Sequence, residues 1–281
     1  MQAPSLRRRN MLAEETEPVG TPVMDPPVPH KKRPSLLNGE PLTAKMQWYI
    51  PPRRPYTRRE LIADRIVNVA GASMAWIGAP ALSSVSWQMD DPVMLQVGVL
   101  ASGLGLIVML NCSAIYHFKC WDWSLATRLY SLDHIGISAM IMGTYSPIMV
   151  YAQAYIILAF VWGLGTVGWA IEARKLLKPQ SPTAGERTAE WSFVDKFNLV
   201  RYLLMGWAGL PLGPALIASN PSLCFMALLG GLMYTGGIIF FVRGNMEFHL
   251  AIWHGFVLLA SVCFYLLIAL YIVGQPLLAY Y

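Results

Sequence analysis

Charged residues are scarce in this sequence. Only 13% of its 281 residues are Asp, Glu, Lys or Arg, whereas 55% are hydrophobic. Soluble domains carry about 25% charged residues, so this composition excludes an ordinary soluble enzyme and favours a polytopic membrane protein. The sequence also lacks the regular spacing of short alternating segments that barrel strands require, which leaves helices as the spanning elements.

Cysteine is sparse as well. The four cysteines are Cys112, Cys120, Cys224 and Cys263, and no two of them form a C-x-x-C pair. Most fall inside or beside apolar runs, so the pattern predicts buried free thiols. The start of the chain lacks an apolar segment, and we therefore expect no signal peptide.

The chain divides at the point where apolar residues begin to dominate. Residues 1–56 are rich in Pro, Arg, Lys and Glu and predict a disordered basic cytoplasmic tail. A short amphipathic piece, Thr57–Arg65, follows, with Thr57 and Glu60 spaced as in a capping box. Residues 57–281 predict an all-α integral membrane domain of seven transmembrane helices. The apolar runs lie near Ile66–Trp87, Val93–Tyr116, Leu129–Tyr151, Tyr155–Ala173, Leu199–Ala218, Ser222–Val242 and Leu250–Val273.

Positive charge is confined to alternate loops. It lies in the tail (Arg7–Arg9, Lys31–Arg33, Arg53, Arg54, Arg58, Arg59), after the second run (Lys119, Arg128), after the fourth (Arg174, Lys175, Lys178, Arg187) and after the sixth (Arg243). The other loops hold only Asp90 and Asp91 or no charge. Because cytoplasmic loops carry the excess of Lys and Arg, we expect a cytoplasmic N-terminus, an external C-terminus and residence in the plasma membrane.

Polar side chains gather at one depth in this topology. The second run ends, and the third and seventh runs begin, at the cytoplasmic face. The residues at those ends are Ser113, His117, Asp133, His134, His249 and His254. Ionisable residues inside a bilayer are costly and usually functional, so the topology predicts one site on the cytoplasmic side.

Imidazoles and a carboxylate favour zinc among the common ions. A catalytic zinc keeps three protein ligands and an open position for water. Asp133 could accept the proton of that water, and Ser113, which shares a helix face with His117, could bond the water or a substrate oxygen. Asp133 could instead be a helix N-terminal charge, and Ser113 an interhelical hydrogen-bonding residue. His134 lies about 100° around the helix from Asp133 and is left out of the ligand set.

Three motifs carry a family resemblance. They are S-x-x-Y-H, then L-D-H-x-G-I with M-G-T-Y-S-P, then H-x-A-I-W-H-x-F-V, supported by E-L-I-A-D-R-I-V-N and G-G-L-M-Y-T-G-G. Together they resemble the hemolysin III group, the microbial branch of the progestin and adipoQ receptor family, which includes the adiponectin receptors. The resemblance covers residues 57 to about 260 in the family's order.

The resemblance implies a seven-helix protein that binds zinc near its cytoplasmic side. In receptor-type members one histidine of helix two and two of helix seven hold the zinc. An Asp of helix three and a Ser of helix two lie near the bound water. Members of that branch are proposed to hydrolyse the amide of ceramide-like lipids. Carried over, His117 and His254 are metal ligands, Asp133 lies near the water and Ser113 assists.

Two positions depart from the family pattern. Leu250 stands where receptor-type members place a histidine, so His249 becomes the predicted third metal ligand. It precedes His254 by five residues, an offset of about 140° and 7.5 Å on an ideal helix, and a π-bulge or an unwound first turn would be needed to align the pair. Asn68 stands where many microbial members carry a histidine on helix one.

Two function classes remain open. The first is a zinc-dependent hydrolase of a lipid amide (ceramidase-like) or ester, with membrane lipids as substrate. The alternative is a non-enzymatic heptahelical receptor or membrane-homeostasis protein with structural zinc, closed by a fourth ligand. Cys112, Cys120 and His134 are the candidates for that ligand. Membrane lysis is disfavoured because no isolated cationic amphipathic helix is present.

Overall fold

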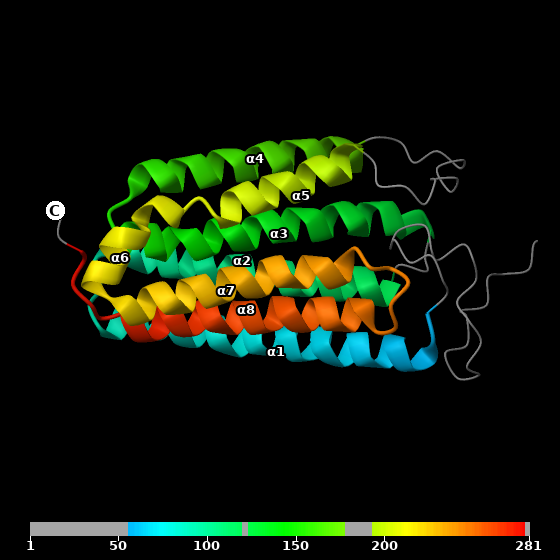
Figure 1. The fold of residues 1–281 in the computed structure, drawn as a ribbon, viewed down its shortest axis with the longest axis horizontal. Coiled ribbons are helices and arrows are strands. Elements are labelled where there is room, and N and C mark those ends of the chain that lie inside the picture. The colour runs from blue at the N-terminus through cyan, green and yellow to red at the C-terminus, as the bar shows by residue number, and fades with distance from the viewer. Residues whose placement is uncertain (1–55, 120–122, 178–192, 279–281) are drawn as a thin grey trace, which may run out of the picture. The chain divides into compact units, whose positions relative to one another are not determined.

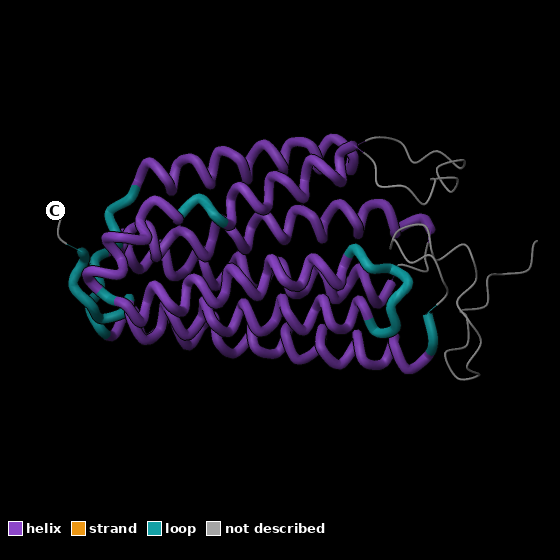
Figure 2. Tube along the Cα trace, viewed as in Figure 1, coloured by secondary structure: helices purple, strands orange, loops and turns teal. Residues whose placement is uncertain are grey.

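The computed structural model describes residues 56–119, 123–177 and 193–278 (Figures 1 and 2). The predicted tail lies outside these ranges except for Tyr56. Every regular element in them is helical, which confirms the all-α fold. The elements are α1 (Arg58–Gln88), α2 (Val93–Lys119), α3 (Trp123–Tyr151), α4 (Tyr155–Leu177), α5 (Phe193–Gly206), the 3₁₀ helix η3 (Leu210–Leu212), α6 (Gly213–Ser219), α7 (Pro221–Phe241) and α8 (His249–Tyr271).

The helices are long and apolar enough to form a membrane bundle. Within the described ranges, 6 helical segments meet the length and hydropathy of a membrane crossing, with α5, η3 and α6 counting as one. The 29 residues of α3 run beside them. Helices α1, α3, α5 and α8 begin at the end of the bundle where α2, α4 and α7 finish (Figure 1). The orientation of that end in the cell stays a prediction.

Helix α1 begins two turns before the predicted apolar run. Thr57 caps it: the Thr57 Oγ1 accepts the Glu60 N–H at 3.4 Å, and the Glu60 Oε2 accepts the Thr57 N–H at 2.8 Å. This reciprocal pair is a capping box, which satisfies two backbone donors at the helix start. The predicted amphipathic piece is therefore the first part of α1, and its acidic residues belong to the bundle.

The fifth crossing is broken at its centre. Helix α5 ends at Gly206, and the chain continues through η3 into α6. Pro211 and Pro214 lack backbone donors and cannot continue the hydrogen-bond ladder. The Tyr145 hydroxyl donates to the Gly206 carbonyl at 2.7 Å and accepts the Gly209 N–H at 3.1 Å. One side chain of α3 thus satisfies the backbone at the break.

Helices α2 and α3 approach backbone to backbone. A Cβ atom on Gly105 would lie 2.5 Å from the Ala139 carbonyl oxygen, and one on Gly143 would lie 2.5 Å from the Ala101 carbonyl oxygen. Small residues permit this close packing of membrane helices. The contact fixes the end of α2 beside the start of α3, where the predicted site residues Ser113, His117 and Asp133 lie.

A buried arginine joins α3, α4 and α5. Arg201 is 1% exposed, and its Nη1 donates to the Ser138 Oγ at 3.1 Å and the Leu164 carbonyl at 3.2 Å. Its Nη2 donates to the Asn198 Oδ1 at 3.1 Å, and the Asn198 Nδ2 donates to the Glu172 Oε1 at 2.9 Å. A buried charge is tolerated only when such partners compensate it. We call these five residues the α5 clasp.

We expect Gly168→Ala to lower the free energy of unfolding by about 1–3 kcal/mol, since overpacking forces neighbours to move. Its Cβ would lie 2.2 Å from the Arg201 Cζ. Gly163 lies on the same helix with nothing within 4 Å of a Cβ, so Gly163→Ala is the matched control. It should be neutral or stabilising by up to about 1 kcal/mol. Thermal unfolding in detergent micelles measures both; equal midpoints would contradict the packing.

Candidate metal centre

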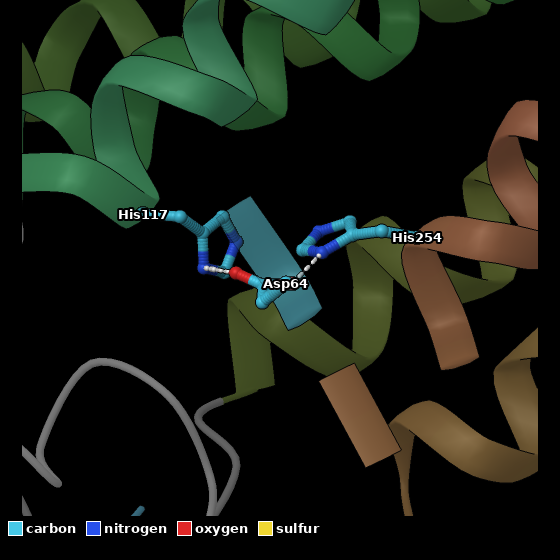
Figure 3. A group of neighbouring side chains, drawn as sticks. All are labelled: Asp64, His117 and His254. Atoms are coloured by element: carbon cyan, nitrogen blue, oxygen red, sulfur yellow. Dashed lines mark hydrogen bonds and ion pairs between the residues drawn. The ribbon is translucent and has the colours of Figure 1, made fainter. Parts of the chain in front are cut away.

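Three side chains from three helices meet near one end of the bundle. Asp64 of α1, His117 of α2 and His254 of α8 each offer a ligand atom, and these atoms lie within 4.8 Å of one another (Figure 3). The Asp64 Oδ1 lies 2.5 Å from the His254 Nδ1, and its Oδ2 lies 3.6 Å from the His117 Nδ1. The centroids of the imidazoles are 4.5 Å apart. We call this group the Asp–His–His centre.

Contacts between the starts of α1 and α8 hold the centre in place. The Glu60 Oε1 accepts the Phe248 N–H at 2.9 Å. Phe248 has a φ of 58°, and this left-handed residue turns the chain into α8. The Tyr56 hydroxyl lies 2.8 Å from the His249 Nε2, and the two rings stack. Asp64 follows Glu60 by one turn, so the same contacts fix its position against α8.

The inner face of α1 carries polar residues at this end and small residues further along the helix. Glu60, Asp64 and Asn68 repeat every four residues and are buried, as are Gly71 and Ala75 beyond them. The Asn68 Nδ2 donates to the Asp64 carbonyl at 2.9 Å. An acidic residue in a spanning helix is costly unless it is paired, and the two imidazoles pair Asp64.

The structure brings two of the three predicted metal ligands together. His117 and His254 belong to the centre. His249 lies at the first position of α8 and is 0% exposed, and its Nε2 contacts the Tyr56 hydroxyl. Helix α8 is regular α-helix from His249 onward, so no bulge removes the offset of about 140° from His254. The part played by His249 as a ligand stays a prediction.

The two predicted catalytic residues lie on α2 and α3. The half-buried carboxylate of Asp133 is close enough to act electrostatically on both His117 and His254. Helix α3 begins at Trp123, more than two turns earlier, and dipole effects fall off within the first turn. Asp133 therefore does not serve as an N-terminal charge. Ser113 is buried one turn before His117 on α2.

The predicted fourth ligands do not join the centre within the described ranges. The His134 Nδ1 lies 2.9 Å from the Tyr130 carbonyl oxygen, so this imidazole is engaged on its own helix. Cys112 is a half-buried free thiol outside the centre. Cys120 lies outside the described residues.

Sequence reasoning missed Asp64 as a member of the site. One signal was available. The capping box of Thr57 and Glu60 marks a helix start, and Asp64 lies one turn after Glu60 on the same face of that helix. An acidic residue at that position lies inside a spanning helix rather than before it.

Comparison with known proteins settles the family. Residues 67–265 match the family described as Haemolysin-III related. The chain belongs to the haemolysin III family. It is 31% identical over 244 residues to the Hemolysin-3 homolog of Bacillus subtilis (strain 168), covering 80% of this chain and 100% of that protein. It is 29% identical over 226 residues to the Hemolysin-3 of Bacillus cereus, covering 76% of this chain and 92% of that protein.

This family belongs to the progestin and adipoQ receptor group, so the resemblance is confirmed. His117, Asp133 and His254 fall within the residues matched to the family, whereas Asp64 precedes them. Sets of two histidines and one carboxylate hold zinc in some hydrolases and iron in some oxygenases. The donor types of the centre therefore fit a divalent metal ion.

We expect His117→Ala and His254→Ala to lose the bound metal, because each removes an imidazole of the centre. His134→Ala, which removes a nearby histidine outside the centre, should retain it. Elemental analysis of the proteins purified in detergent gives the metal content. Full retention in both of the first two variants would refute the centre, and complete loss in His249→Ala would establish His249 as a ligand.

Proposed function

We propose that this haemolysin III protein is a zinc-dependent hydrolase of a lipid amide bond. The carrying observation is the Asp–His–His centre, in which two imidazoles and a carboxylate from three helices bring their ligand atoms within 4.8 Å of one another. A site with several titratable groups in a water-poor environment is the arrangement that hydrolytic enzymes use to move protons. The family pattern supports zinc as the metal.

The imidazoles of His117 and His254 suit zinc, since neutral imidazole is among its preferred ligands. When bound, zinc supplies Lewis acidity and lowers the pKa of a coordinated water. His117 and His254 would hold it, and the contacts between the starts of α1 and α8 keep the helix of His254 against that of Asp64.

Asp133 and Ser113 supply the proton transfer and the orientation. The Asp133 carboxylate receives the proton of the attacking water and returns it to the leaving amine. The Ser113 hydroxyl, one turn from His117 on the same face of α2, donates a hydrogen bond to the substrate carbonyl oxygen. Ser113 belongs to α2 and Asp133 to α3, two helices that pack closely against each other.

The depth of the site fits a membrane lipid as substrate. The centre lies near the end of the bundle where α1 and α8 begin (Figure 1), and an amide near the head group of a lipid lies at such a depth. Described Lys and Arg residues near the same helix ends include Arg58, Arg59, Arg128, Arg174, Lys175, Lys196 and Arg243, whereas the loop between α1 and α2 at the other end carries Asp90 and Asp91. This distribution of Lys and Arg supports a cytoplasmic N-terminus.

Asp133→Asn should lower ceramide hydrolysis by about 10²–10⁴-fold, the usual contribution of a general base, while the bound metal is retained. Turnover of a ceramide with a fluorescent acyl chain, assayed in mixed micelles beside the metal content, measures both. Asp195→Asn is the matched control, since Asp195 lies near the same end of the bundle and bonds to the Tyr130 hydroxyl.

The outcomes separate the function classes. Ser113→Ala should lower turnover less than Asp133→Asn, because it removes one hydrogen bond. Unchanged turnover in Asp133→Asn would refute the mechanism. A wild-type protein that holds metal and hydrolyses no lipid amide or ester would establish the alternative, a receptor with structural metal.

A further inference from the structure

The contact between Asp64 and His254 is too short for two ligands of one metal ion. Their Oδ1 and Nδ1 atoms are 2.5 Å apart. Zinc ligands lie about 2.0–2.2 Å from the ion in tetrahedral directions, so two of them are about 3.3 Å apart. A separation of 2.5 Å is instead that of a short charge-assisted hydrogen bond. The Nδ1 of His254 is thus engaged by the carboxylate.

The two oxygens of Asp64 divide between the two histidines. The Oδ1 faces the His254 Nδ1, and the Oδ2 faces the His117 Nδ1 at 3.6 Å. In Figure 3 the dashed lines from Asp64 reach one nitrogen of each imidazole, and the second nitrogen of each ring lies away from those lines. One carboxylate therefore addresses the Nδ1 of both rings.

Asn68 is consistent with this assignment. Its Nδ2 lies 3.3 Å from the His254 Nδ1 and donates to the Asp64 carbonyl at 2.9 Å. A single Nδ1 cannot donate a proton to a carboxylate and also accept one from an amide. The shorter, charge-assisted contact decides the tautomer. The His254 Nδ1 therefore carries the proton and donates a hydrogen bond to the Asp64 Oδ1.

We propose that Asp64 is a positioning residue that bridges the Nδ1 atoms of His117 and His254 and leaves their Nε2 atoms to bind the metal. Carboxylates commonly take this role beside metal-bound histidines, where they fix the tautomer and the ring orientation. The inference rests on the metal centre of the proposed function, but it holds for any divalent ion and for either function class.

The assignment has a consequence for the site. A carboxylate that stays off the metal supplies orientation and negative charge without occupying a coordination position. His117 and His254 then supply two protein ligands through Nε2, and the third protein ligand of a catalytic zinc stays the predicted His249. Under this assignment Asp64 does not act as a substitute ligand for the histidine that receptor-type members carry at the position of Leu250.

Pulsed electron paramagnetic resonance of the copper(II)-loaded full chain tests this assignment. The quadrupole coupling of the remote imidazole nitrogen reports the hydrogen bond made at that nitrogen. We expect two coordinated imidazoles in the wild type, in Asp64→Asn and in Asp64→Ala. The remote-nitrogen coupling should change in both variants, more in Asp64→Ala, and copper affinity should fall by about 10–100-fold without being abolished.

A ligand role for Asp64 predicts a different result. Both variants would then lose copper as completely as His254→Ala, or would keep it with unchanged remote-nitrogen couplings, and either result would overturn the assignment. Asp91→Asn is the control for loss of a buried carboxylate. Asp91 bonds to the Ser86 hydroxyl at 2.6 Å and the Gly274 N–H at 2.8 Å, where α1 ends, and its replacement should leave the spectrum unchanged.

Failure of this inference is distinguishable from failure of the proposed function. A wild-type protein with the expected spectrum but no lipid-amide hydrolysis would refute the hydrolase and leave the role of Asp64 intact. A protein that hydrolyses the amide while Asp64→Asn shows an unchanged spectrum would do the reverse. A wild-type protein that binds neither copper nor zinc would overturn the metal centre and the inference together.

Discussion

The structure depends on a single carboxylate that joins the first helix to the last. Glu60 accepts the Thr57 N–H with one oxygen and the Phe248 N–H with the other, across 188 positions of sequence. The first contact begins α1, and the second begins α8 beside it. Since Asp64 and His254 each follow the start of their helix by one to two turns, their positions depend on where the two helices begin.

Much of the fold and two of the three residues of the centre could be predicted from the sequence. Apolar runs locate crossings because lipid demands long apolar helices, and alternating loop charge brings the end of α2 and the start of α8 to one face. That argument placed His117 and His254 together. It missed Asp64, because the start of α1 is less apolar than its continuation and was assigned to a separate surface piece. The capping spacing of Thr57 and Glu60 carried the missing information.

Other features could not be obtained from spacing. The spacing of His249 and His254 gives the angle between them about the axis of α8. It does not reveal that Tyr56, which precedes α1, contacts His249. The break in the fifth crossing is signalled by Gly and Pro, yet the Tyr145 hydroxyl that satisfies the broken backbone comes from α3. Such contacts depend on which helices become neighbours, and a single sequence does not state this.

The α5 clasp affects how the fifth segment is inserted into the membrane. Arg201 lies within the span Phe193–Ser219, where a charged side chain facing lipid is costly, and α5 also carries Asn198 on its buried face. Their partners, Ser138 and Glu172, lie on helices that are synthesised earlier. The fifth segment can therefore leave the translocation channel at low cost only against helices already in the bilayer, which gives the assembly of this bundle a fixed order.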